Sequence, residues 1–278
     1  MTANLSTSDG FLLALGTLAA VGTACAVLSV FVVLLKWSFM GEGISHAGFA
    51  GAGTAALLAG VFPALDSIIA GYAISVIFCF ATAGCIGWIA RRRGVSGDAA
   101  IGAFVVASLA WGAVASTLRP GTTGGLNAYL FGNVAEISTV TLFAALCVAA
   151  IILLVVVLLG REFLFYCFDA TLAQVSGIPV AAAHYMLVFL IAFAIVAAMK
   201  LLGFLLAPAF IILPGALALS LSVRLKTVFA LAIASTLAAV AVGLFLAARW
   251  HFVEAGAPIV LGLFVQFILA VALRRTKV

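Results

Sequence analysis

Long uncharged apolar segments dominate this chain and leave few folds open to it. Nine windows of about 20 residues are almost wholly hydrophobic, the length of a helix that crosses the hydrocarbon core of a bilayer. The chain is 67% hydrophobic and 8% charged, whereas a soluble domain is about half apolar and a quarter charged. We therefore expect an all-α polytopic membrane protein in which residues 1–278 form one bundle. The predicted spans are 11–35, 43–62, 67–89, 99–117, 136–159, 180–199, 202–221, 227–248 and 257–273.

The distribution of basic residues predicts the orientation of these spans. If the chain crosses nine times, ten of its thirteen Lys and Arg residues lie on one side. Such residues concentrate on the cytoplasmic side of a membrane, so we expect the N-terminus outside and the C-terminus in the cytoplasm. The net charge of +5 then reflects topology, and no nucleic-acid partner is expected. The ten residues are Lys36, Arg91, Arg92, Arg93, Arg161, Arg224, Lys226, Arg274, Arg275 and Lys277, and the others are Arg119, Lys200 and Arg249.

The second span opens with the most distinctive polar pair in the chain. Glu42 and His46 are four residues apart, a spacing that puts both side chains on one helix face. A charge at membrane depth costs about 2.5–3.5 kcal/mol on insertion scales, so such residues usually have a function. A carboxylate oxygen and an imidazole nitrogen together suit a divalent transition metal. The alternative is a buried polar pair that bonds only to neighbouring helices.

Other polar residues are weaker candidates for a metal site. His184, near the inner end of the sixth span, could be a second ligand, an exit-path residue or a structural histidine. His251 and Glu254 share an outer loop, where they could receive metal or simply face solvent. The sequence has no Cys and His quartet of the kind that holds structural zinc.

The seventh span contains residues that interrupt helices. Pro208 and Pro214 lie within it, and Gly203 lies near its start. Proline removes a backbone donor and kinks a helix, and broken membrane helices either line cavities or are reinforced by neighbouring helices. Both a structural kink and a moving, pathway-lining element fit this pattern.

Several stretches in order along the chain form a recognisable pattern. They are 41–47 (GEGISHA), 98–102, 168–180 and 202–206 followed by 212–216, with 127–132 and 256–260 also similar. With these stretches the chain resembles the membrane permease subunits of bacterial ABC transporters for zinc, manganese and iron. It departs from the family pattern where Glu42 replaces the usual Asp, Gly43 the usual Ala, and Pro208 a small polar residue.

The resemblance implies a homodimeric permease in the bacterial cytoplasmic (inner) membrane. Its partners would be two copies of a cytosolic ATPase subunit, a second permease copy and an extracytoplasmic metal-binding protein. The imported cargo would be Zn²⁺ or Mn²⁺, with Fe²⁺ also compatible, and no cofactor would be permanently bound. By the same resemblance residues 168–179 couple the permease to the ATPase, although a plain loop is the alternative. The coupling residues would be Phe168, Asp169, Thr171, Gln174, Gly177 and Pro179.

Two other functions compete with this interpretation. The chain lacks the Gly-x-x-x-x-Gly-Lys-Ser/Thr phosphate-binding motif, so its energy must come from a partner or from an ion gradient. A proton-coupled secondary metal transporter could use Glu42, His46 and His184 as a proton relay. A membrane metalloprotease is less consistent with the sequence, which contains no His-Glu-x-x-His motif. We therefore expect no enzyme activity from this chain itself.

Overall fold

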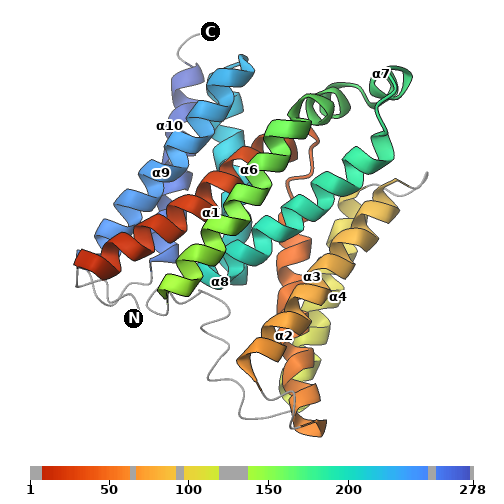
Figure 1. Cartoon of the computed structure of the whole chain (residues 1–278), viewed down its shortest axis with the longest axis vertical. Helices are drawn as coiled ribbons and strands as arrows, with labels where there is room; N and C mark the ends of the chain where they lie inside the picture. Colours follow the sequence, from red (N-terminus) through yellow and green to blue (C-terminus); the bar gives the residue numbers. More distant parts are fainter. Residues whose placement is uncertain (1–7, 63–66, 92–96, 119–136, 250–254, 276–278) are drawn as a thin grey trace.

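The computed structural model describes residues 8–62, 67–91, 97–118, 137–249 and 255–275. The described chain is mainly helical, as predicted (Figure 1). Arg92, Arg93, Arg119, His251, Glu254, Lys277 and residues 127–132 lie outside the described residues. The helices are α1 (Ser8–Leu34), α2 (Met40–Val61), α3 (Ile68–Ala90), α4 (Gly97–Leu118), α6 (Thr139–Phe168), α7 (Ala170–Val175), α8 (Val180–Leu221), α9 (Leu225–Arg249) and α10 (Gly256–Arg275).

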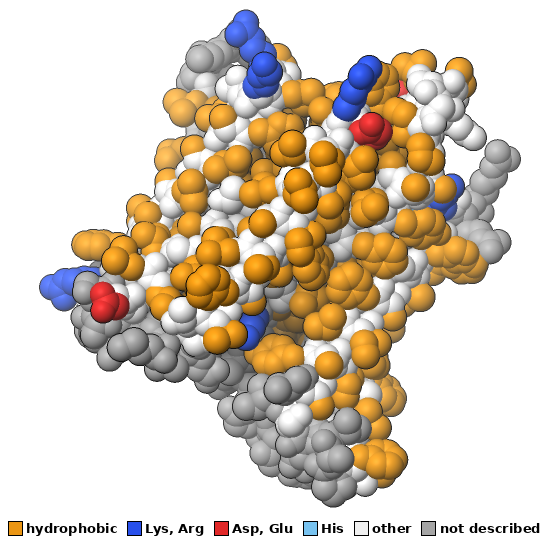
Figure 2. Space-filling view, in the orientation of Figure 1, with side chains coloured by type: hydrophobic (Ala, Val, Ile, Leu, Met, Phe, Trp, Pro, Cys, Tyr) orange, Lys and Arg blue, Asp and Glu red, His pale blue; other side chains and the backbone are white. Residues whose placement is uncertain are grey.

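Eight segments of the described helices are long and apolar enough to cross a membrane. The predicted seventh span corresponds to a shorter apolar helix, Leu206–Leu221, which falls below the roughly 20 residues that a perpendicular crossing needs. The nine predicted spans therefore appear as eight full-length helices and one short one. Figure 2 shows hydrophobic side chains over the flank of the bundle, with most of the visible Lys and Arg near one end.

Helix α6 is longer than predicted. The expected span ended at residue 159, but the helix continues to Phe168 and includes Arg161 and Glu162. Its 30 residues correspond to about 45 Å, whereas the hydrocarbon core is about 30 Å thick. Helix α6 is thus longer than the apolar layer is thick, and its charged residues Arg161 and Glu162 lie in its last three turns.

Helix α8 is interrupted at Gly203 rather than at either proline. Gly203 has φ 77° and ψ 164°, a backbone region that is open almost only to glycine. Pro208 and Pro214 both lie within the helical second leg of α8. The predicted spans 180–199 and 202–221 are thus the two legs of α8.

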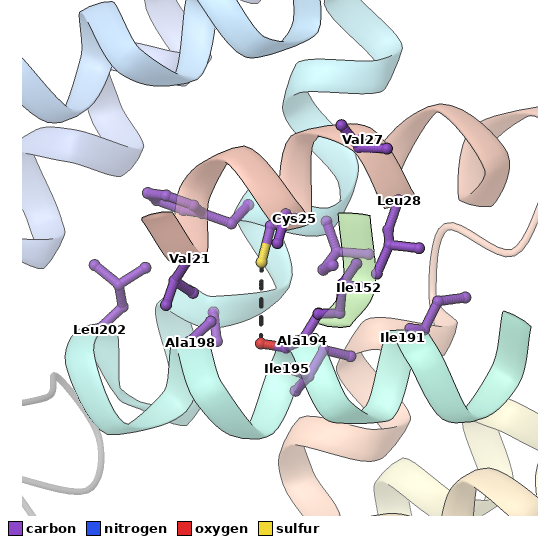
Figure 3. Close-up of a cluster of buried hydrophobic side chains, with 14 of the residues drawn as sticks. Val21, Cys25, Val27, Leu28, Ile152, Ile191, Ala194, Ile195, Ala198 and Leu202 are labelled. Atoms are coloured by element: carbon purple, nitrogen blue, oxygen red, sulfur yellow. Dashed lines mark hydrogen bonds between the residues drawn. The ribbon is translucent and has the colours of Figure 1, made fainter. Parts of the chain in front are cut away.

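The two legs of α8 run in opposite directions along α1. In the first leg Leu202 lies beside Val21 and Ile191 beside Leu28, so this leg is antiparallel to α1 (Figure 3). At the centre of this contact, Cys25 Sγ lies 3.9 Å from the Ala194 carbonyl oxygen.

The second leg of α8 contacts α1 in the same order along both helices. A Cβ built on Gly22 would lie 3.1 Å from the Phe210 ring, and one built on Gly215 would collide with the Ser29 backbone. Contacts in this order make the second leg parallel to α1. The chain therefore reverses at Gly203.

Helix α2 packs closely against its neighbours. A Cβ built on Gly51 would lie 2.6 Å from Ser75 Cα on α3, and one built on Gly53 would lie 2.8 Å from Ala115 Cβ on α4. Small residues allow membrane helices to approach this closely. These contacts hold the middle of α2 against α3 and α4, as expected for an internal helix, and most residues of its first turns are also buried.

Candidate metal site

The His46 imidazole is held in one tautomer by its own helix. His46 is buried, with 6% of its surface exposed, and its Nδ1 lies 2.8 Å from the Glu42 main-chain oxygen. A carbonyl oxygen only accepts hydrogen bonds, so Nδ1 carries the proton and the Nε2 of the neutral ring keeps its lone pair. Metal-binding histidines commonly use this arrangement, in which one ring nitrogen donates to a carbonyl and the other binds the metal.

The Glu42 carboxylate remains available for a ligand. Glu42 lies in the first turn of α2 and is half-buried. Its link to His46 runs through the main-chain oxygen, and within the described parts of the chain its carboxylate has no ion-pair partner. The same residues contain no group of three or more His, Cys, Asp or Glu that could hold a metal. One copy of the chain thus offers two protein ligands at this position.

Two aromatic rings cover one side of His46. The Phe204 ring lies edge-on to the imidazole, with centroids 5.5 Å apart, and it stacks on Phe49 at 5.1 Å. Phe49 lies three residues beyond His46 on α2, and Phe204 follows the Gly203 break directly. The rings exclude water from this side of the site and tie it to the reversal point of α8.

Pro208 explains how α2 is attached to that reversal point. In a regular helix the N–H of residue 208 would donate to the carbonyl of Phe204, but proline has no N–H. The Ser45 hydroxyl donates to this carbonyl instead. A buried carbonyl that would otherwise lack a partner thus bonds α2 to the second leg of α8, one residue before His46.

The structure places His184 in a different environment from Glu42 and His46. Its Nε2 lies 3.0 Å from the Gly87 carbonyl oxygen, and its Nδ1 lies 2.9 Å from the Tyr166 hydroxyl. Both ring nitrogens are therefore engaged, and neither offers a free lone pair to a metal. Within the described residues His184 does not join the other two in a three-ligand group.

The predicted coupling segment contains a short helix with a defined start. Helix α7 spans six residues, and Asp169 caps its N-terminus. The Asp169 Oδ1 accepts hydrogen bonds from the N–H groups of Thr171 at 2.8 Å and Leu172 at 2.9 Å. Such a cap satisfies N–H groups that have no partner inside a helix.

The end of α7 is equally well defined. Gly177 has φ 83°, and its N–H donates to Gln174 O at 3.1 Å, while Ile178 N–H donates to Ala173 O at 3.0 Å. These two bonds form a Schellman motif, whose left-handed residue is usually glycine. Pro179 then precedes the first residue of α8.

Helix α7 presents apolar side chains outward. Phe168 at the end of α6 is 66% exposed, and Leu172 and Val175 on α7 are 53% and 83% exposed. Thr171 and Gln174 are exposed beside them. This end of the molecule therefore carries a small apolar and polar surface on a short helix that is capped at both ends.

The sequence did not identify several residues that shape the site. Ser45 and Phe204 are 159 positions apart, and Gly87 and His184 are 97 apart. The one available signal was the position of Pro208, four residues after Phe204, which predicts a carbonyl without its helical partner. Nothing local indicated which side chain would satisfy it.

Comparison with known proteins identifies the family. The model of the ABC 3 transport family matches residues 9–274. The chain is 35% identical over 266 residues to a "Probable iron transport system membrane protein" of Haemophilus influenzae, covering 95% of this chain and 94% of the relative. It is 34% identical to the "Manganese transport system membrane protein MntC" of Halalkalibacterium halodurans, covering 90% and 82%.

A solved structure has the same fold. "PsaBC from Streptococcus pneumoniae in complex with Fab" matches with a TM-score of 0.77 and 30% identity, covering 93% of this chain and 90% of that chain. The helical fold, the family match over nearly the whole sequence and the similarity to this structure all agree. The chain belongs to the ABC 3 transport family.

Proposed function

We propose that this chain is the membrane permease subunit of an ABC importer for a divalent transition metal. Its family and its similarity to proteins named for iron and manganese transport support this function. The observation that carries the proposal is the buried His46, whose Nε2 has no hydrogen-bond partner among the described residues. It lies one helical turn from the Glu42 carboxylate, which also has no ion-pair partner in that part of the chain. This oxygen and nitrogen pair suits a divalent metal.

The cargo we favour is Mn²⁺ or Fe²⁺. Carboxylate and imidazole ligands accept either ion, whereas a site selective for softer metals would include thiolates. The named relatives carry manganese or iron in their descriptions, and Zn²⁺ is the competitor to test. Two ligands from one chain hold an ion more weakly than the four of a structural zinc site, which suits a site that must release its cargo.

The orientation follows from the basic residues. The ends of α1, α3 and α6 and the start of α9 lie toward the end of the bundle that carries α7 (Figure 1). Lys36, Arg91, Arg161 and Arg224 lie at or near these helix ends in the sequence. By the positive-inside rule this end faces the cytoplasm, and the start of α1 faces outward. The protein is then a multi-pass protein of the bacterial cytoplasmic membrane, with α7 on the ATPase side.

Transport proceeds by alternating access between two permease copies. An extracytoplasmic binding protein releases the ion at the outer face, and Glu42 and His46 bind it near the inner end of α2. Two cytosolic ATPase subunits hydrolyse ATP and move α7, which changes the packing around Phe204 and releases the ion inward. No step requires bond chemistry by this chain.

Uptake by purified protein in liposomes tests this function. With the metal-binding protein outside the vesicles and the ATPase subunits and ATP inside them, we expect Mn²⁺ uptake, reduced by excess Fe²⁺ more than by excess Zn²⁺. The chain alone in a proton gradient should take up no metal. Uptake without the ATPase would favour the proton-coupled alternative, and absence of ATP-driven uptake would contradict the proposal.

The cap of α7 gives a prediction for coupling. Asp169→Ala removes both cap bonds, at about 1 kcal/mol of local stability, from a helix too short to persist alone. We expect weaker co-purification with the ATPase and several-fold slower uptake, while Asp169→Asn, which keeps an acceptor oxygen, stays close to wild type. Replacing 169–176 with a flexible linker should abolish uptake. Normal ATPase binding by the linker variant would show that α7 is not the coupling element.

A further inference from the structure

His184 joins separate segments at the inner end of the bundle. It lies in the second turn of α8 and contacts Gly87 on α3 and Tyr166 on α6. The Trp37 ring, in the turn between α1 and α2, lies edge-on to the imidazole at 5.0 Å. His184 itself is 3% exposed. The described residues thus bring three helices and an interhelical turn together on one buried ring.

The chemistry of these contacts fixes the ring. The Gly87 carbonyl can only accept, so His184 Nε2 donates to it, and in the neutral ring Nδ1 then accepts from the Tyr166 hydroxyl. Hydrogen bonds are strong where water is excluded, and a buried group that loses its partner is costly. The imidazole therefore cannot move independently of α3 and α6 without breaking a buried bond.

The hydrogen bond between Tyr166 and His184 joins α6 and α8, the two helices that flank α7. Tyr166 lies two residues before the end of α6, and His184 lies five residues after Pro179. Helix α7 is the segment between them. A displacement of α7 therefore acts on the His184 ring through α6, which carries Tyr166, and through α8, which carries His184 itself.

The other contacts of His184 lead to the metal-binding end of α2. Lys36 adopts a left-handed conformation with φ 59°, which turns the chain so that Trp37 meets His184. The Trp37 carbonyl accepts the N–H of Met40, the first residue of α2, at 2.9 Å.

The Gly87 contact gives a second connection to α2. A Cβ on Gly43 would lie 3.1 Å from Ile86, the neighbour of Gly87 on α3. Gly43 is itself next to Glu42. Displacement of the His184 ring therefore acts on the first turn of α2 through Trp37 and through α3 at Ile86 and Gly87.

We propose that His184 is a positioning residue that couples movement of α7 to the Glu42 and His46 end of α2. This inference rests on the proposed function, because it gives His184 a task only if an ATPase moves α7. It differs from a ligand role, since both ring nitrogens are bonded to protein. It also predicts a specific defect, in which ATP is hydrolysed and metal is bound but little metal is transported.

The test compares variants in the reconstituted complex with its ATPase. His184→Ala removes both bonds, and Tyr166→Phe removes one. His184→Gln can still donate to Gly87 and accept from Tyr166. Gly87→Ala leaves every polar group in place but puts a Cβ 3.3 Å from His184 Nε2. Its matched control is Gly84→Ala, one turn earlier on α3, where the new Cβ would lie 3.9 Å from Phe189.

The readouts are Mn²⁺ transported per ATP hydrolysed and equilibrium Mn²⁺ binding to the complex. We expect His184→Ala and Gly87→Ala to lower the ratio about fivefold, a size typical of coupling through packed networks, with binding within about twofold. His184→Gln and Gly84→Ala should resemble wild type. Adding Tyr166→Phe to His184→Ala should cause no further loss, because both act through one bond.

Several results would overturn the inference. A normal transport ratio in both His184→Ala and Gly87→Ala would show that the ring transmits nothing. Loss of Mn²⁺ binding in His184→Ala would indicate a ligand role instead. If His184→Ala fails to assemble, Gly87→Ala and His184→Gln decide the question alone. A wild-type complex that transports no metal would contradict the proposed function, and that result is visible before any variant is compared.

Discussion

Metal uptake is expected to fall about 100-fold in a His46→Ala variant, the upper end of losses seen when even indirect partners of a metal are removed. Among the described residues His46 supplies an imidazole nitrogen, Nε2, that has no hydrogen-bond partner. Glu42→Gln keeps the shape of its side chain but removes the charge, and it should reduce uptake at least about tenfold. The measurement is initial Mn²⁺ uptake by the reconstituted complex, with equilibrium Mn²⁺ binding measured in parallel.

A matched comparison separates ligation from damage to the fold. His184→Gln removes the other buried imidazole of the described chain and should leave Mn²⁺ binding unchanged. Both His46→Ala and Glu42→Gln should still co-purify with the ATPase, because α7 packs mainly against α6 and α8 and neither substitution changes its cap. Wild-type uptake by both variants would remove the pair from the transport path, whatever the outcome for His184.

Gly203→Ala is expected to destabilise the protein by about 1–3 kcal/mol, the cost of placing a side chain in a backbone region reserved for glycine. The strain cannot be relieved locally, since Leu202 and Phe204 on either side are buried and Ser45 holds the Phe204 carbonyl. The thermal unfolding temperature of the purified complex measures the effect. Uptake should also be lost, because the position of Phe204 over His46 depends on the reversal.

Gly160→Ala is the control for that variant. Gly160 lies in α6, and a Cβ there would have no atom within 4 Å among the described residues. Because alanine favours a helix over glycine by about 1 kcal/mol, this variant should be as stable as wild type or slightly more stable. Equal stability of Gly203→Ala and Gly160→Ala would mean that the chain need not reverse sharply at Gly203.

The spans could be predicted because burial in hydrocarbon demands a long run of apolar residues, which a sequence shows directly. The end of α6 could not be predicted in this way. Arg161 and Glu162 mark where the apolar run stops, but neither residue breaks a helix, so α6 continues to Phe168. Hydropathy locates the membrane boundary, whereas Asp169 and its cap locate the end of the helix.

Part of the candidate site could likewise be predicted from the sequence, and part could not. The spacing of Glu42 and His46 predicted a shared face, and the bond from His46 Nδ1 to the Glu42 carbonyl is a contact within one helical turn. The spacing gave no indication that the link would use the main chain and leave the carboxylate free. For His184 the sequence favoured a structural histidine over a ligand without identifying its partners, and the structure shows hydrogen bonds to Gly87 on α3 and Tyr166 on α6.

The sequence alone determined the class of protein, the approximate spans and the pair of residues with metal-binding chemistry. Each of these depends on composition or on spacing within a few helical turns, so it can be derived from neighbouring positions. The tertiary structure decided that α8 reverses at Gly203, that Ser45 takes the carbonyl left free by Pro208, and that His184 links α3 to α6. These features depend on which helices meet, and helix contacts are set by close packing between residues far apart in the chain.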